Sequence, residues 1–302
     1  MSVELHGALV SPTRRRAQNK DKVNVLIAAN YCDDKMLSDM AELGDDGRLL
    51  IDSGAFTAWK AGKEVKLDDY LKFLGDLPVK PYAYFMLDVI GDPKATHENF
   101  VEMRAQGFDP IPIFTRGDDL QSLEFYFEQS GRVALGGLVG TKGNLGFVNG
   151  LMAHIRDRPV HWLGFTRRDW LGKYKPDSCD SSSWARAFRY GHMDTYLGRG
   201  RWASLRMTDF AKRPSKMVVD AVRSFGVDPL RLAHRDEWNN KTKGPDETDW
   251  SAIQLLTYRS WLTYQADVER LIGTKFFLAF GSSEQTAKML RTHKYLQGGT
   301  ST

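Results

Sequence analysis

The hydrophobic positions of the chain fall into short continuous runs that are separated by amphipathic stretches. The runs are rich in Val, Ile, Leu and aromatic residues, a pattern typical of strands buried on both faces of a parallel sheet. We expect strands at 23–29, 48–52, 82–88, 110–114, 133–138 and 160–165. We expect helices between them at 34–43, 66–75, 95–106, 119–129 and 144–156. This alternation of strand and helix indicates βα units around a parallel sheet.

The rhythm predicts an α/β fold, a (β/α)8 TIM-like barrel, because the units follow one another without a topological break. A doubly wound open sheet gives a similar pattern and is the alternative. After residue 205 the pattern changes to a helix, a polar turn-rich segment, a long helix, a last strand in "KFFLAFG" and a helix at 283–295. We expect a basic N-terminal arm at 1–22 and a single barrel domain at 23–302. Within it, 207–302 would hold the last barrel units and a C-terminal helical extension or insertion.

Several predicted strands end in an acid or a glycine. These ends carry Asp52, Asp88, Arg116 with Gly117, Gly136 with Gly137, and Gly164. In a parallel barrel the carboxyl ends of the strands converge on one face, where ligands bind. A helix cap or a turn explains each residue taken singly, but their agreement favours a shared site.

The basic residues are grouped in three segments, although their excess over the acidic residues is small. The chain has 42 Lys and Arg against 38 Asp and Glu, a net charge of only +4. They gather at 13–22, 166–175 and 186–206, and aromatic residues accompany the last two clusters. Basic and aromatic residues together suit a polyanion with stackable bases, although an ordinary basic surface fits equally well. The residues predicted to bind nucleic acid are Arg186, Arg189, Arg199 and Arg201.

Some classes of protein are excluded by simple counts. The two cysteines, Cys32 and Cys179, are too few for a cysteine-rich zinc site or a three-cysteine iron–sulfur site. The glycine run "ALGGLVGTKG" fits neither a phosphate-binding loop nor a dinucleotide fingerprint. No apolar run is long enough for a signal peptide or a membrane span, so we expect a cytoplasmic protein with no membrane partner.

A second acidic cluster, "YKPDSCDSSSWARAFRYG", places Asp177 and Asp180 among serines. Hydroxyl groups beside a carboxylate keep it ionised, which suits a nucleophile. Carboxylate nucleophiles are suited to attack at a sugar anomeric carbon. A loop with local side-chain-to-backbone hydrogen bonds is the alternative. This segment alone leaves open which aspartate would act.

The stretch "LLIDSGAFTAW" resembles the Asp-Ser-Gly-Gly-Phe segment of the tRNA-guanine transglycosylases, with Ala55 in place of the second glycine. Four later segments resemble that family in the same order: "YFMLDVIGDP", "VALGGLVG", "HWLGFT" and "SCDSSSWAR". The last keeps the family's spacing between nucleophile and arginine at Asp180 and Arg186, which favours Asp180 over Asp177. The resemblance covers roughly 48–186.

The resemblance implies roles for individual residues. Asp180 would be the nucleophile, and Asp52 would transfer a proton at the base. Phe56 and Leu163 would lie on the two faces of the base. Arg116 stands where the family has a base-binding glutamine. The implied substrate-binding residues are Asp88, Phe56, Ser53, Gly54, Arg116, Gly136, Gly137, Leu138, Leu163 and Gly164.

The family's zinc-binding cysteines are missing, so we expect no zinc subdomain, no metal and no cofactor besides the base substrate. In this the chain is most similar to phage-type relatives that insert 7-deazaguanines into DNA. The implied function is a pentosyltransferase that replaces guanine in DNA with a 7-deazaguanine (preQ0-like) base through a covalent aspartyl–glycosyl intermediate. The implied partners are nucleic acid, contacted in part by 207–302, and the free base. The resemblance leaves open whether the protein forms a homodimer. If the protein is phage-encoded, its expected location is the cytoplasm of the host.

Three alternatives remain. The same chemistry could act on tRNA, although DNA is favoured because the zinc site is missing. A non-catalytic nucleic-acid-binding paralogue would be expected to lose the nucleophile or the proton-transferring acid, and both positions are filled here. An unrelated barrel hydrolase could use paired carboxylates, but it would not need Phe56 or the Gly-Gly-Leu segment.

Overall fold

The computed structural model describes residues 22–138, 144–185, 192–210, 214–239 and 249–296. The chain divides into two compact units. One consists of Lys22–Trp184 and Tyr264–Arg291, and the other of Met1–Asp21, Ala185–Thr263 and Thr292–Thr302. The single domain expected at 23–302 is therefore distributed over two units, which are described separately below.

The larger unit is built around an eight-stranded sheet. Its strands are β1 (Val23–Ala28), β2 (Gly47–Asp52), β3 (Ala83–Tyr84), β4 (Ile113–Phe114), β5 (Val133–Leu135), β6 (Val160–Trp162), β7 (Ser178–Ser181) and β10 (Lys275–Phe280). Neighbouring strands pair in the order β3-β2-β1-β10-β7-β6-β5-β4, and every pair is parallel. Parallel neighbours need a crossover between them, and helices provide it.

The sheet is curled, as aromatic contacts between its distant strands show. The ring of His161 on β6 lies 5.0 Å from Phe85, which follows β3, and 6.2 Å from Phe277 on β10. A flat sheet in this strand order would keep β3 far from β6. A single parallel bridge, Phe85 to Ile111, also links the chain after β3 to the chain before β4. The unit is thus a mixed α/β structure with a curled parallel sheet, compatible with a TIM-like fold.

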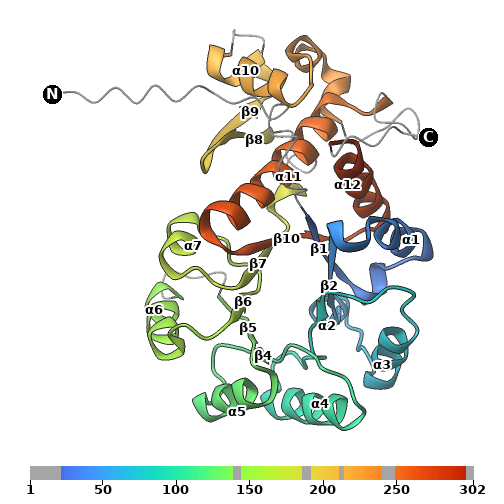
Figure 1. Cartoon of the computed structure of the whole chain (residues 1–302), viewed down its shortest axis with the longest axis vertical. Helices are drawn as coiled ribbons and strands as arrows, with labels where there is room; N and C mark the ends of the chain where they lie inside the picture. Colours follow the sequence, from blue (N-terminus) through green and yellow to red (C-terminus); the bar gives the residue numbers. More distant parts are fainter. Residues whose placement is uncertain (1–21, 139–143, 186–191, 211–213, 240–248, 297–302) are drawn as a thin grey trace, which may run out of the picture. The chain divides into compact units, whose positions relative to one another are not determined.

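Helices surround the outside of this sheet, as Figure 1 shows for α1 and α3 to α7. The helices that follow the strands of the larger unit are α1 (Asp34–Leu43), α2 (Ala55–Lys60), α3 (Leu67–Gly75), α4 (Pro93–Ala105), α5 (Leu120–Ser130), α6 (Asn144–Ile155), α7 (Arg168–Tyr174) and α12 (Ser283–Leu296). The first residues of α12 belong to this unit and the last to the other. Helices α1, α3, α4, α5, α6 and α12 agree with the pattern of the sequence to within a few residues.

Local sequence explains where α1 begins and what it buries. The Asp33 carboxylate accepts a hydrogen bond from the Met36 backbone N–H at 2.8 Å, which caps the helix. Met36, Leu37 and Met40 are buried on one side of the helix. All six residues of β1 are buried as well, as expected for a parallel strand covered on both faces.

The smaller unit contains an antiparallel hairpin that the sequence pattern did not predict. Strand β8 (His192–Gly198) pairs with β9 (Arg201–Arg206). Arg199 and Gly200 form the turn, both with positive φ. The helices are α9 (Met207–Phe210), α10 (Lys216–Ser224) and α11 (Ala252–Ile272), and the last residues of α11 belong to the larger unit. The Trp202 ring packs on Trp261 of α11, 4.7 Å away. Across the described residues, no helix combines the length and apolar character needed to cross a membrane.

Candidate active site

The turn after β2 holds Asp52 in a defined orientation. One Asp52 carboxylate oxygen accepts a hydrogen bond from the Gly54 backbone N–H at 2.6 Å. Gly54 has a φ of +81°, and a Cβ at this position would lie 2.7 Å from the Asn30 side-chain oxygen. Glycine is therefore favoured at this turn by its backbone conformation, and any side chain here would also displace Asn30. The Ser53 hydroxyl accepts a hydrogen bond from the Ala55 N–H at 3.2 Å, where α2 begins.

Asp88 lies beside this turn, after the buried segment that follows β3. The Ser53 hydroxyl donates a hydrogen bond to an Asp88 carboxylate oxygen at 3.4 Å. Burial raises the pKa of Asp88 above its usual value, and hydrogen bonds from its own backbone N–H and from Ser53 partly oppose this. Ser53 therefore joins the strand end that carries Asp52 to the one that carries Asp88.

Asp180 stands near the end of β7 and is 8% exposed. Its Oδ1 atom accepts a hydrogen bond from the Gly164 backbone N–H at 2.8 Å. The same oxygen lies 3.2 Å from Nε2 of His161, a fully buried side chain on β6. Asp180 is thus fixed by two groups from the neighbouring strand and the turn after it.

The charges of Asp88 and Asp180 act on Asp52. The pKa of Asp52 is raised to about 6, chiefly by burial and further by the negative charges of Asp88 and Asp180, while the Gly54 N–H opposes the rise. Such coupling requires the groups to lie in one poorly solvated region. An acid that titrates near neutral pH can both give and accept a proton.

Two consecutive glycines, Gly136 and Gly137, follow β5 and leave the backbone there without side chains. A Cβ on the buried Gly136 would lie 3.0 Å from the Thr115 hydroxyl and 3.8 Å from a methyl group of Leu163. Gly137 has a φ of +65° and lies against the backbone of Arg116. Leu138 is buried, whereas the Arg116 side chain is exposed and its guanidinium lies 5.5 Å from the Phe147 ring. The segments containing Gly136 and Leu163 are therefore adjacent, as their place in the sheet requires.

Phe56 is 52% exposed on the short helix α2. Its ring stacks on Trp59 at 6.1 Å, and the Lys60 ammonium group lies 4.0 Å from the ring centre. An exposed ring beside a cation can accept a flat partner. Its distance from the carboxylates is set by α2, which begins two residues after Ser53 in the chain.

The residues predicted to bind nucleic acid belong to the other unit. Arg199 is the first turn residue of the β8–β9 hairpin, and Arg201 begins β9. Arg186 and Arg189 lie outside the described residues. The two described arginines therefore belong to one hairpin end.

Sequence reasoning missed His161 and Ser178. Nδ1 of His161 lies 2.9 Å from the Ser178 hydroxyl, and both side chains are buried. Their Cα atoms are register partners across β6 and β7. The available signal was spacing: Ser178 and Asp180 are two residues apart, so on a strand they face the same side. Reading 174–191 as a loop concealed it.

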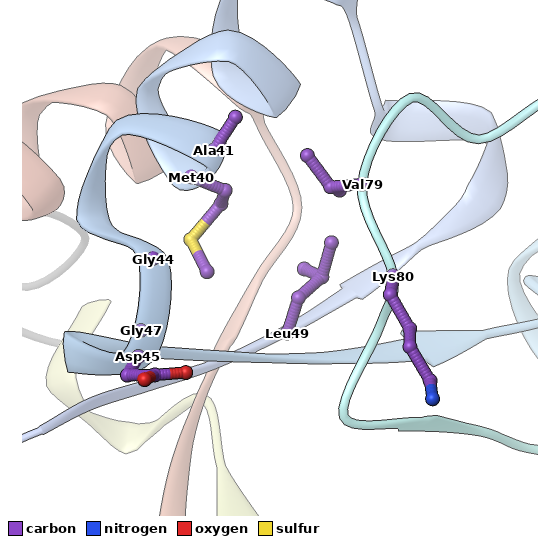
Figure 2. Close-up of a pocket in the computed structure, with 8 residues that line it drawn as sticks. All are labelled: Met40, Ala41, Gly44, Asp45, Gly47, Leu49, Val79 and Lys80. Atoms are coloured by element: carbon purple, nitrogen blue, oxygen red, sulfur yellow. The ribbon is translucent and has the colours of Figure 1, made fainter.

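An open hollow of about 320 Å³ lies elsewhere, at the amino end of β2 (Figure 2). Because β2 begins at Gly47 and ends at Asp52, this hollow is at the opposite end of the strand from the carboxylates. The residues around it are Met40, Ala41, Gly44, Asp45, Gly47, Leu49, Val79 and Lys80.

Within the described residues, no group of three or more His, Cys, Asp or Glu side chains is arranged to hold a metal ion. A scan of the sequence against protein-family models matches no family, and a search of curated proteins finds no significant match. The grouped carboxylates can support proton transfer and nucleophilic attack.

Proposed function

We propose that this protein is a base-exchange transglycosylase that replaces guanine in DNA with a 7-deazaguanine derivative. The observation that carries the proposal is the place of Asp52 beside the charges of Asp88 and Asp180, where burial and these charges raise its pKa to about 6. Asp52 ends β2, Asp88 follows β3 and Asp180 is the third of four residues in β7, so all three lie toward the carboxyl ends of parallel strands, where barrels place their active sites. We also propose that the curled sheet belongs to a (β/α)8 TIM-like barrel, in which the Phe85–Ile111 bridge links the chain after β3 to the chain before β4.

The first step uses Asp180 as the nucleophile and Asp52 as the acid. A carboxylate oxygen of Asp180 attacks the anomeric carbon of a nucleotide that has left the base stack. The bond from this carbon to guanine breaks with its electron pair on the base, and protonated Asp52 supplies the proton to the base nitrogen. The product is a glycosyl ester of Asp180 and free guanine.

The second step reverses these roles with a different base. Ionised Asp52 removes the proton from the ring nitrogen of the incoming 7-deazaguanine. This nitrogen then attacks the same carbon, and the Asp180 carboxylate leaves. Two displacements at one carbon retain its configuration. A pKa of about 6 for Asp52 suits this double duty, since both forms are populated near neutral pH.

Base recognition is assigned to the groups around the carboxylates. Asp88 would accept hydrogen bonds from the base N–H and amino groups. The exposed ring of Phe56 and the side chain of Leu163 would cover the two faces of the base. The Gly137 N–H and Arg116 would meet its carbonyl oxygen, because a glycine at a positive φ leaves the backbone accessible there.

DNA is the proposed polymer, in keeping with the two cysteines of the sequence, which cannot form the zinc site of the tRNA enzymes. The basic hairpin end with Arg199 and Arg201 would contact phosphates of either polymer. If the protein acts on tRNA and not on DNA, tRNA replaces DNA as the proposed substrate.

The experiment is an exchange assay with labelled 7-cyano-7-deazaguanine and unlabelled duplex DNA, single-stranded DNA or tRNA. Mass spectrometry of the released nucleosides identifies the product, and denaturing electrophoresis detects a covalent protein–nucleic acid adduct. Incorporation into DNA with a trapped adduct is the expected result. Incorporation into tRNA alone would change the polymer, and neither incorporation nor an adduct with any polymer would overturn the proposal.

A further inference from the structure

The carboxylate of Asp180 has two oxygens in different environments. Oδ1 is held by the Gly164 N–H at 2.8 Å and faces Nε2 of His161 at 3.2 Å. Both hydrogen bonds of the Asp180 carboxylate within the described residues involve Oδ1, and none involves Oδ2. A carboxylate oxygen whose lone pairs accept two hydrogen bonds is a weaker nucleophile than its unoccupied partner. The two oxygens are therefore not equivalent.

His161 is placed by the sheet itself rather than by a flexible loop. It pairs in register with Ser178, and Asp180 lies two residues further along β7, on the same side of the strand. The imidazole is fully buried between Phe85, 5.0 Å away, and Phe277, 6.2 Å away. These contacts fix the ring plane, so its two nitrogens point to Ser178 and Asp180 and nowhere else.

The hydrogen bonds also define which nitrogen of the neutral ring carries the proton. An ionised carboxylate can only accept, so Nε2 must donate to Asp180. Nδ1 of a neutral ring then has to accept, and the Ser178 hydroxyl, 2.9 Å away, is the donor available to it. Ser178 thereby selects the Nε2–H form of His161, and His161 in turn orients Asp180.

We propose that His161 is a positioning residue for the nucleophile, which holds Oδ1 of Asp180 so that Oδ2 is the attacking atom, with Ser178 setting the form of the imidazole. This inference rests on the proposed function, because it takes Asp180 as the nucleophile. It goes beyond that function in naming the atom that attacks and the buried pair of residues that selects it.

Two matched substitutions separate positioning from mere packing. The amide nitrogen of His161→Gln can reach the place of Nε2 and donate to Asp180. His161→Asn places its amide at the level of Nδ1, where it reaches Ser178 but not Asp180. Both are neutral, polar and smaller than histidine, so loss of packing affects them alike. His161→Phe keeps an aromatic ring between Phe85 and Phe277 but provides no donor.

The measurement is the single-turnover rate of covalent adduct formation on the polymer that the wild-type protein modifies. Loss of a hydrogen-bonding partner that orients a metal-ligating side chain costs roughly 10- to 100-fold, and we expect His161→Asn and His161→Phe to be slower by that range. We expect His161→Gln to retain most of the wild-type rate. Thermal unfolding of each variant checks that it is folded. Equal rates for Gln and Asn would overturn the inference.

Two further measurements separate this inference from the proposed function. If the wild-type protein forms no adduct on DNA or tRNA, the proposed function fails. If it forms one that is indifferent to Gln and Asn at 161, only the inference fails. Nitrogen NMR of the free, ring-labelled protein should find the Nε2–H form of His161 and a shift toward the other form in Ser178→Ala, with no shift in Ser181→Ala. An Nδ1–H form in the wild-type protein would contradict the assignment without reference to activity.

Discussion

The two ends of the eight-stranded sheet treat charged side chains in opposite ways. At the amino ends, Asp177 has two partners of opposite sign, since it lies 2.9 Å from the Lys275 ammonium and 3.4 Å from the Arg132 guanidinium. At the carboxyl ends, Asp52, Asp88 and Asp180 form no ion pair with Lys or Arg within the described residues, and the pKa of Asp52 is raised. Cations therefore neutralise Asp177, whereas Asp52, Asp88 and Asp180 have no such partner in the described part of the chain.

The difference teaches that strand direction decides what an aspartate on this sheet can do. Asp177 and Asp180 are three positions apart in one serine-rich segment, and the sequence offered both as nucleophiles. Asp177 precedes β7, where two cations hold its charge, whereas Asp180 is near the end of β7, where backbone and imidazole groups contact it. Ion pairing at the amino end contributes to stability, and unpaired acids at the carboxyl end are available for chemistry.

The largest effect is expected when each of these aspartates is replaced by asparagine. Asp180→Asn should lower the rate of adduct formation by at least about 10⁴-fold, since removal of a nucleophile costs this much or more in other enzymes. Asp177→Asn should leave the rate within about tenfold and instead lower the free energy of unfolding by roughly 1–3 kcal/mol, because Lys275 loses a charged hydrogen-bond acceptor and Arg132 loses an ion-pair partner. Adduct assays and denaturant unfolding of both variants provide the measurements. If Asp180→Asn still forms the adduct, Asp180 is not the nucleophile and the contrast between Asp177 and Asp180 fails.

A smaller kinetic effect is expected at Asp52, which handles a proton rather than the covalent bond. Asp52→Asn should slow adduct formation by roughly 10²- to 10⁴-fold, the usual contribution of a general acid. The wild-type rate of this first step should fall as the pH rises above about 6, because Asp52 loses the proton it must donate. Single-turnover rates between pH 5 and 9 test this. A wild-type rate that is flat across this range, or that falls equally in Asp52→Asn, would remove Asp52 as the acid.

The fold was largely accessible from the sequence because parallel strands and their helices carry strong patterns. The helix expected at 34–43 is α1 (Asp34–Leu43), and the strand expected at 48–52 is contained in β2. The strands expected at 82–88, 133–138 and 160–165 end earlier than predicted, at Tyr84, Leu135 and Trp162. Most residues beyond these points are apolar or glycine, so the sequence continues the strand pattern past the last residue of each regular strand.

The acids at the carboxyl ends could also be predicted from the sequence, because an acid that directly follows an apolar run can be recognised without a structure. The partners of Asp180 were not. The strand β7 is "SCDS", and Ser, Asp and Cys give no β-branched or aromatic signal, so the segment was interpreted as a loop. His161 lies within "VHWLGF", an apolar run that does not indicate which face each residue takes. Only the register of β6 with β7 brings His161 to Ser178 and Asp180.

Stability should respond to pH at the carboxyl end in a direction opposite to that of ordinary acids. Asp52 has a pKa raised from 3.8 to about 6, so the folded state holds the proton more tightly than the unfolded state. The contribution of Asp52 to the free energy of unfolding is therefore greatest below pH 4 and is lost as the pH rises from about 4 to 6. Above that, the buried charge costs up to about 3 kcal/mol, the equivalent of this change in pKa.

Asp52→Asn removes that charge and should raise the free energy of unfolding at pH 8 by up to about 3 kcal/mol, with little change at pH 4. Asp45→Asn, at an exposed position by the amino end of β2, is the matched control and should change stability by less than about 0.5 kcal/mol at either pH. Urea unfolding at the two pH values provides the measurement. A destabilised Asp52→Asn protein at pH 8 would mean that the ionised carboxylate contributes to stability through contacts that outweigh its burial.

The smallest effect is expected at the amino ends, where Arg48 of β2 pairs with Glu269 of α11 at 2.7 Å and both lie within the larger unit. The same guanidinium also donates to the Asn24 side-chain oxygen at 3.2 Å. Glu269→Gln keeps a hydrogen-bond acceptor for Arg48 but removes the charge, so we expect a loss of roughly 1 kcal/mol in the free energy of unfolding. The rate of adduct formation should be unchanged, since the pair lies at the end of the strands away from Asp52 and Asp180. Unfolding in urea at low and at 1 M salt, together with single-turnover kinetics, measures both. A rate that falls as far as in Asp52→Asn would show that the ion pairs of one end and the free acids of the other act as one system, and the division between them would have to be abandoned.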